Sequence, residues 1–170
     1  MENIEIIPLM GIKLNDKTIA LSASREDVVN LLGEPYGKWK NYLYYFKNEL
    51  RFVFDKKEKI EFIEFLGGID GEIQPSIYGV SAFGMDAKEL YDILAERNNG
   101  DITDNENGYS YAFLNISVGI FRDRIPEGVQ EMIEEAKEEG EPMVDEDIEY
   151  EMRKADHWAT IGIGIKDYYR

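Results

Sequence analysis

The chain has 170 residues, of which 44% are hydrophobic and 32% charged, and its 35 acidic and 19 basic side chains give a formal net charge of −16. A field of that sign repels phosphate backbones and anionic lipid, which excludes nucleic acid and membrane as expected partners, and the lack of cysteine excludes disulfides and thiolate chemistry. We expect one globular domain, residues 1–170, that buries about two thirds of the surface of the unfolded chain.

The N-terminal sequence MENIEIIPLMGIKL starts with acidic residues and has no apolar run long enough for a signal peptide or a membrane span. We therefore expect a cytoplasmic protein. The negative field would steer a cationic protein towards the chain and speed its association, so a basic protein is the expected partner. The alternative, that acidic residues only keep the protein soluble, stays open on charge alone.

Residues 24–35 have the pattern of a short amphipathic helix. Ser24 is a suitable N-cap, and Asp27 stands where a capping box needs an acidic side chain. The apolar residues fall on one face of this helix, and Gly33 and Pro35 end it. A second helix with the same pattern follows the cap residue Asp86.

Each predicted helix leads into an aromatic hairpin. The first, YLYYFKNELRFVF, covers Tyr42–Phe54, and the second, YSYAFLNISVGIF, covers Tyr109–Phe121. Both share the pattern Tyr-x-Tyr-x-Phe-x-Asn, in which aromatic residues at every second position predict a strand with one aromatic face. The shared asparagines, Asn48 and Asn115, are expected in the turns, because asparagine tolerates a left-handed backbone.

A third strand is expected after each hairpin, at Ile60–Phe65 in the first copy and at Thr160–Ile165 in the second. In the second copy, residues 126–155 intervene and carry two helical apolar stripes that Gly140 separates. Twelve acidic and three basic residues between Glu127 and Lys154 give this insertion more than half of the net charge.

These elements predict an α+β fold. Two α-β-β-β repeats, at about residues 20–66 and 82–169, form one antiparallel sheet with both helices on one face, and residues 126–155 add an inserted acidic helical pair. A single copy has too little apolar surface to fold well, whereas two copies side by side bury the helices and close an internal sheet edge.

The order helix, hairpin, strand, given twice, resembles the tandem-repeat fold of the β-lactamase inhibitor proteins. The segment SREDVVNLLGEP also resembles the helix of small outer-membrane assembly lipoproteins of the BamE/SmpA type. Small acidic α+β proteins of this sort are similar to bacterial toxin immunity proteins, which neutralise a toxin by occupying its surface. These resemblances imply a protein-binding function and assign no individual binding residue.

The leading hypothesis is a non-catalytic inhibitor or immunity protein that occludes a cationic partner. Tyrosine is enriched in binding surfaces, so aromatic residues of the first hairpin are candidate contacts, and Trp39 is expected to be an exposed anchor in the preceding loop, whereas Trp158 is expected in the core. Packing of the tyrosines under a helix is the open alternative. The candidate partner-binding residues are Trp39, Tyr42, Tyr44, Glu134, Glu135, Glu138 and Glu139.

An assembly adaptor built on the same repeats is the second hypothesis, and an enzyme is the third. His157 is the only histidine, and a structural role is favoured for it, because no serine elbow, HExxH motif or phosphate loop accompanies it. The turn GDITDNENG has part of the spacing of a calcium loop but lacks its leading Asp and closing Glu. The glycines of IGIGI, Ile161–Ile165, favour a strand with close backbone approach. We expect no cofactor and no metal.

Overall fold

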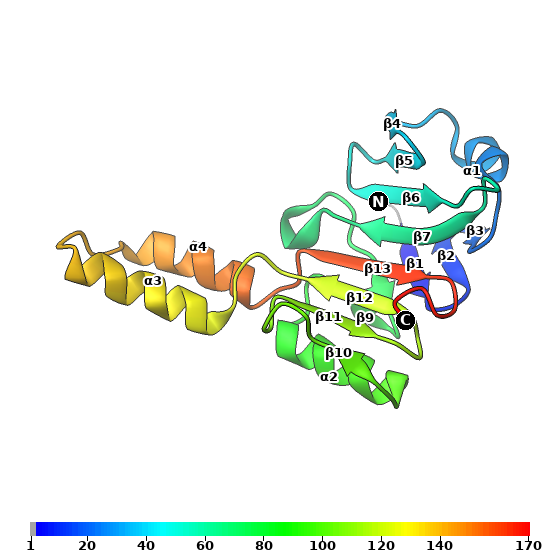
Figure 1. Ribbon diagram of the computed structural model, residues 1–170. Helices are drawn as coiled ribbons and strands as arrows, with labels where there is room; N and C mark the ends of the chain where they lie inside the picture. The colour runs from blue at the N-terminus through cyan, green and yellow to red at the C-terminus, as the bar shows by residue number, and fades with distance from the viewer. Residues whose placement is uncertain (1–2) are drawn as a thin grey trace.

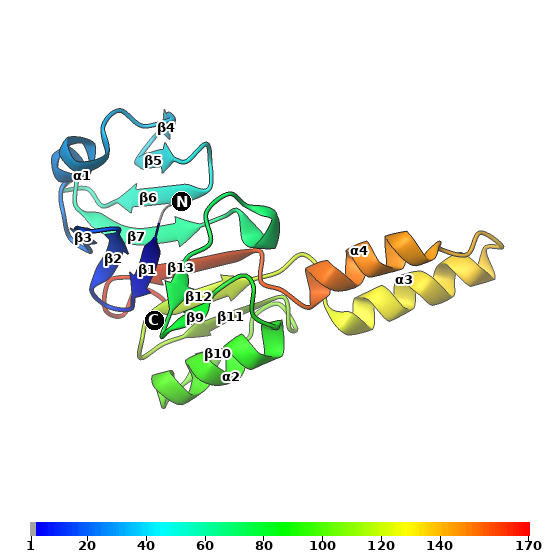
Figure 2. The same ribbon diagram turned by 180° about the vertical axis from the view of Figure 1, so that it is seen from behind.

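A computed structural model describes residues 3–170 of the chain (Figure 1). Over these residues the fold is α+β, with four α-helices and two β-sheets. The larger sheet faces the viewer in Figure 1, and the smaller sheet lies behind it, as the reverse view in Figure 2 shows. Two of the helices extend away from this body as a pair.

The larger sheet has eight strands in the order β10-β11-β12-β13-β7-β6-β5-β4, and every pairing between neighbours is antiparallel. Its central pair, β7 and β13, joins strands from the first and second halves of the chain. The bounds are β4 Gly37–Trp39, β5 Tyr42–Tyr45, β6 Leu50–Phe54, β7 Ile60–Phe65, β10 Ile102–Thr103, β11 Ser110–Phe113, β12 Val118–Phe121 and β13 Thr160–Gly164.

The smaller sheet has the order β3-β2-β1-β8-β9 and corrects the expectation of a single antiparallel sheet. Its β1 and β8 run parallel, and its other pairings are antiparallel. Apolar and charged residues alternate over only a few positions, as in Ile4-Glu5-Ile6 and Ile12-Lys13-Leu14, and such short signals do not show that these strands form a second sheet. Their bounds are β1 Ile4–Ile7, β2 Gly11–Leu14, β3 Lys17–Ala20, β8 Ser76–Ile77 and β9 Val80–Ser81.

The first two helices begin at side-chain caps. Ser24 accepts a hydrogen bond from the backbone N–H of Asp27, whose carboxylate accepts one from the N–H of Ser24, so the predicted capping box is confirmed. Asp86 caps the second helix through its carboxylate. The bounds are α1 Arg25–Leu32, α2 Ala87–Asn98, α3 Pro126–Glu138 and α4 Asp145–Ala155, with a 3₁₀ turn, η1, at Gly68–Asp70.

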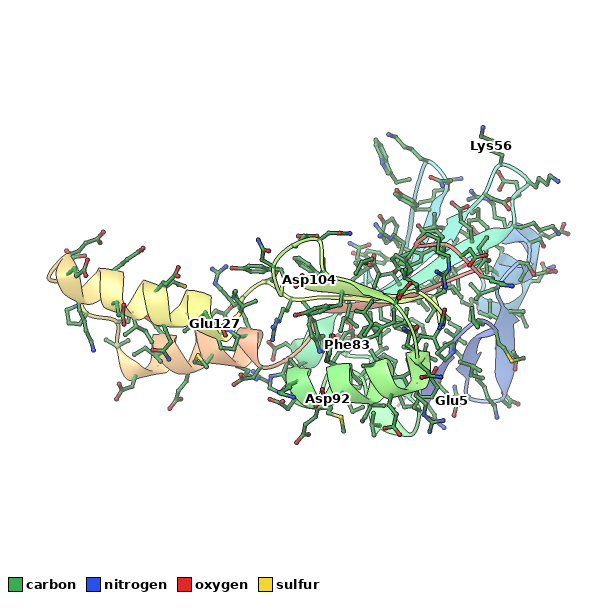
Figure 3. All side chains as sticks on the ribbon, turned by 60° about the horizontal axis from the view of Figure 1, so that its bottom comes forward. Glu5, Lys56, Phe83, Asp92, Asp104 and Glu127 are labelled. Carbon is green, nitrogen blue, oxygen red and sulfur yellow. The ribbon has the colours of Figure 1, made fainter. Side chains whose placement is uncertain are left out.

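One face of the larger sheet packs against the smaller sheet, α1 and α2. The facing side chains belong to one buried cluster, in which Val28 of α1, Leu90 and Leu94 of α2 and Ile12 of β2 are fully buried with Ile63 of β7. Figure 3 shows α2 and the smaller sheet on the same side of the larger sheet. The core therefore lies between two layers, and the other face of the larger sheet has no helix on it.

The aromatic pattern shared by the two hairpins does not mark equivalent positions. Tyr45 pairs with Leu50 at the end of β5, and Phe113 pairs with Val118 at the end of β11, so the counterpart of Phe113 is Tyr45 and not Phe46. A shift of one residue turns every side chain of a strand to the other face. The matching tyrosines of the two hairpins accordingly lie on opposite faces of the sheet.

Asn48 and Asn115 lie in the hairpin turns as predicted, but neither has the left-handed backbone that was the reason for the prediction. In the first turn the left-handed residues are Phe46 and Lys47, with φ of 51° and 54°, and in the second turn the left-handed residue is Ser117. Asn115 instead donates its side-chain amide to the carbonyl of Asn98 and so fastens the hairpin to the end of α2. A side-chain bond of this kind cannot be foreseen from turn propensities.

Residues 126–155, the helical arm, project from the body as two adjacent helices (Figures 1 and 2). The arm is inserted between β12 and β13, which are paired neighbours. Salt bridges attach its base to the body, from Arg124 to Glu151 at 2.7 Å and from Arg153 to Asp70 at 2.9 Å. Gly140, with φ of 78°, lies in the connection between α3 and α4.

We predict that replacing the two tryptophans lowers the free energy of unfolding by very different amounts. Trp158 is 1% exposed and donates its indole N–H to the carbonyl of Ala87, so Trp158→Ala should lower the free energy of unfolding by about 3–5 kcal/mol. Trp39 is 62% exposed, and Trp39→Ala should change that free energy by about 0.5 kcal/mol or less. Urea unfolding of both variants measures the difference, and equal losses would contradict the assigned core.

Candidate functional site

The face of the larger sheet that points away from α1, α2 and the smaller sheet is here named the open face. Side chains at alternate positions of each strand lie on this face. One row of directly paired residues crosses all eight strands on it. From β4 to β10 the row is Gly37, Tyr44, Arg51, Glu64, Gly162, Gly119, Ala112 and Thr103.

The open face carries large aromatic side chains on strands β4 and β5. Trp39 pairs with Tyr42 across β4 and β5, and the rings of Tyr42 and Tyr44 meet edge to face with centroids 6.4 Å apart. Trp39 is largely exposed, and both tyrosines are half-buried. The structure therefore brings these three predicted contact residues together, and it places Trp39 on strand β4 instead of in a loop.

An ion pair lies at the centre of the open face. Arg51 of β6 donates a hydrogen bond from Nη2 to Oε1 of Glu64 on β7, and its guanidinium lies 4.9 Å from the ring centroid of Tyr42. The two side chains are 25% and 17% exposed. Burial raises the pKa of the Glu64 carboxyl, and the positive charge of Arg51 opposes that shift.

Residues 165–170 cross the open face over β7, β13 and β12. Tyr168 stacks on Phe62 with ring centroids 4.7 Å apart, and Tyr169 meets Phe62 edge to face. A Cβ atom on Gly119 would come within 2.2 Å of the Tyr169 hydroxyl, and one on Gly162 would come within 2.2 Å of the Phe62 ring. The glycines thus let aromatic rings lie directly on the strands, which accounts for the two glycines in the sequence TIGIG of β13.

Tyr169 is held in a partly enclosed position between these strands and Glu64. Burial raises the pKa of its phenol, and the negative charge of Glu64 adds to the shift. The phenol therefore stays protonated at neutral pH and remains a neutral hydrogen-bonding group.

The acidic candidates of the helical arm lie apart from the aromatic candidates. All four are exposed on the distal part of α3 and at its end, whereas β4 and β5 lie at the opposite edge of the body (Figure 1). The structure therefore offers two separate surfaces and not one combined site. The four arm residues are Glu134, Glu135, Glu138 and Glu139.

Sequence reasoning missed the ion pair and the tyrosines of residues 165–170. A signal for Arg51 and Glu64 exists, because Arg51 is the one charged residue of LRFVF and Glu64 is one of the two in the otherwise apolar IEFIEF. No local signal marks Tyr168 and Tyr169, since only the folded chain shows that they return to the sheet.

The remaining candidates have local structural roles. Nδ1 of His157 lies 2.8 Å from the carbonyl oxygen of Arg153, so the ring is bonded to the last turn of α4. Asp104 accepts a hydrogen bond from the N–H of Gly108 within the GDITDNENG turn. Within residues 3–170 no group of three or more His, Asp or Glu side chains is arranged to hold a metal ion.

Comparison of the chain with protein-family models, curated proteins and solved structures found no significant match. The resemblance to β-lactamase inhibitor proteins and to immunity proteins therefore stays a prediction. No helix within residues 3–170 is long and apolar enough to cross a bilayer.

We predict that Arg51 and Glu64 are strongly coupled. Removing one partner leaves the other partly buried and uncompensated, so Arg51→Met and Glu64→Gln should each cost about 1–3 kcal/mol, and the double variant should lose less than their sum. Urea unfolding of the four proteins in this cycle gives the coupling energy. A coupling below about 0.5 kcal/mol, as for a solvent-exposed pair, would show that the sheet does not shield these charges.

Proposed function

We propose that the protein is a non-catalytic binding protein of the inhibitor or immunity type, which occludes a cationic partner protein through the open face. The observation that carries the proposal is the cluster of Trp39, Tyr42, Tyr44 and Arg51 on this face. Tryptophan, tyrosine and arginine are the residues that dominate the energy of protein interfaces, because they bury large areas and keep polar ends available.

The exposure of Trp39 supports this use of the open face. A tryptophan that is 62% exposed on an edge strand contributes little to the core, and Lys40 lies 5.5 Å from its ring centroid. The neighbouring tyrosines have few rotatable bonds and lose little entropy when a partner fixes them. Such a surface is suited to contact with another protein.

The helical arm supports a cationic partner. Of its acidic side chains, all within the described residues, Glu151 is the only one in a salt bridge. The charge of the others is therefore not neutralised locally and attracts positive charge over about 10 Å at 0.1 M salt. We assign the arm to steering the encounter and the open face to holding the complex.

For the fold, we propose two repeats of one helix-and-three-strand unit, with the arm as an insertion in the second. The strand order supports this, because β5 to β7 and β11 to β13 each run in chain order towards the central pair, with β4 and β10 as short additional edge strands. Tandem units of this kind are what the resemblance to β-lactamase inhibitor proteins implies. We also propose a cytoplasmic location, in keeping with the cysteine-free composition.

An assembly adaptor is the second candidate, and the exposed apolar side chains of the arm are the observation that favours it. Val144 precedes α4 and is 59% exposed, and Tyr150 of α4 is 55% exposed, so the arm offers apolar contacts outside the open face. An adaptor would hold two proteins at once, whereas an inhibitor forms a one-to-one complex and abolishes its partner's activity. We rank an enzyme third, since the ring of His157 is bonded to backbone.

We predict that Trp39→Ala speeds dissociation of the partner. The tagged full chain captures the partner from lysate of the source cells, and surface plasmon resonance then measures both rate constants with the purified pair. Loss of a central aromatic anchor should cost about 2 kcal/mol, or roughly 30-fold in the dissociation rate. Tyr150→Ala, an exposed aromatic on the arm, is the matched control, and an unchanged dissociation rate for Trp39→Ala would remove the open face from the proposal.

We predict that charge reversal on the arm acts on association. Four arm glutamates changed to lysine should slow association about tenfold at low salt and flatten its salt dependence, with little effect on dissociation. A control reverses four exposed acids on the body, so both variants have equal net charge. The arm set is Glu134, Glu135, Glu138 and Glu139, and the body set is Glu5, Asp16, Glu26 and Glu89. Equal effects of the two sets would show that net charge alone, and not the arm, guides the partner.

A further inference from the structure

The open face contains a cavity of about 200 Å³ beside residues 165–170. It lies over β11, β12 and β13, and Glu64 of β7 forms part of its lining. Glu64 is the charged residue of its lining, and the other polar side chains are hydroxyls and one amide, which can accept or donate hydrogen bonds. The lining residues that matter below are Glu64, Ser110, Ala112, Gly119, Thr160 and Tyr169.

Small side chains create this cavity. In the cross-strand row, Gly162, Gly119 and Ala112 follow directly after Glu64, so three adjacent strands carry nothing larger than a methyl group there. Tyr169 lies over Gly119 and forms one wall. On β5 and β6 the same row holds the large side chains of Tyr44 and Arg51, so the open face has no such cavity over these strands.

The cavity has unused acceptors. Oε1 of Glu64 accepts from Arg51, and no residue within 3–170 donates a hydrogen bond to its Oε2. The Tyr169 hydroxyl likewise has no hydrogen-bond partner within those residues. Ser110 donates from Oγ to Glu106 at 3.0 Å, which brings a second carboxylate to the edge of the cavity.

We propose that this cavity binds a primary ammonium group, and that its natural occupant is a lysine side chain of the cationic partner. The identity of the occupant rests on the proposed function, whereas ammonium binding does not. Glu64 and Glu106 together balance the charges of Arg51 and an incoming ammonium, so the filled site is close to neutral.

Lysine fits this site better than arginine does. A guanidinium binds a carboxylate best through two parallel hydrogen bonds, and Arg51 already occupies one oxygen of Glu64. An ammonium is a point charge with three donors, which matches one carboxylate oxygen and nearby hydroxyl oxygens such as those of Tyr169 and Thr160. An anion finds two carboxylates there and is repelled.

The test uses the full chain and n-butylammonium, which reproduces the lysine side chain. We expect saturable shifts of the Ala112, Gly119 and Gly162 amide signals in ¹⁵N NMR spectra, with a Kd on the order of 10 mM for one charge-assisted contact. Neutral n-butanol should give no saturable shift, and n-propylguanidinium should bind at least fivefold more weakly. Equal binding of butanol and butylammonium, or no saturable shift with butylammonium, would overturn the proposal.

Variants assign the binding to the cavity. Glu64→Gln should weaken butylammonium binding at least tenfold, while Glu61→Gln, on the same strand but outside the cavity lining, should leave it unchanged. Because Glu64→Gln also removes the partner of Arg51, Ala112→Leu provides a second variant that fills the cavity and keeps the ion pair. Binding that persists in a folded Ala112→Leu protein would place the ammonium elsewhere and overturn the assignment.

The affinity of the variants for the captured partner distinguishes partner binding by the open face from lysine binding in the cavity. If Ala112→Leu weakens the complex at least tenfold, the lysine assignment is supported. If Trp39→Ala weakens the complex and Ala112→Leu does not, the open face still binds the partner, but the lysine assignment is overturned. Loss of binding after acetylation of a single partner lysine identifies the residue that enters the cavity.

Discussion

The antiparallel pairing of β7 with β13, with Ile63 opposite Ile163, is the contact on which the rest of the structure depends. It joins strands from the two halves of the chain into one sheet and places fully buried isoleucines at the centre of the core. Since side chains alternate along a strand, the register that turns these isoleucines inward also turns Glu64 and Gly162 outward. The core and the open face are thus fixed by the same pairing.

The open face takes its character from two unlike halves. On one side, β4 and β5 carry Trp39 and the two outward-facing tyrosines, Tyr42 and Tyr44. On the other side, β12 and β13 have glycines on which residues 165–170 lie. Between them stands the Arg51–Glu64 pair, held by charge in a partly buried setting. The asymmetry gives one sheet both a protruding aromatic surface and a recessed acidic cavity. In the proposed function, steering by the arm and retention by the open face are assigned to separate surfaces.

The sequence predicts what local patterns determine, and the structure adds what pairing determines. The capping box at Ser24, strand Ile60–Phe65 and the burial of Trp158 follow from local residue types and are confirmed. The shared aromatic pattern does not align the hairpins, because it is offset by one residue relative to the strand ends, at Tyr45 and Phe113, and such an offset reverses the faces. The smaller sheet has only short alternating signals, and the return of Tyr168 to the open face depends on contacts remote in sequence.

Side-chain footprinting of the chain with its captured partner tests most directly whether the open face is the binding surface. Hydroxyl radicals oxidise exposed aromatic rings, and mass spectrometry gives the rate at each residue with and without the partner. The proposed complex should protect Trp39, Tyr42 and Tyr44 and leave Tyr78 and Tyr91, which pack against the core on the other side of the sheet, unchanged. Protection of Tyr78 and Tyr91, with Trp39 still freely oxidised, would contradict the proposal.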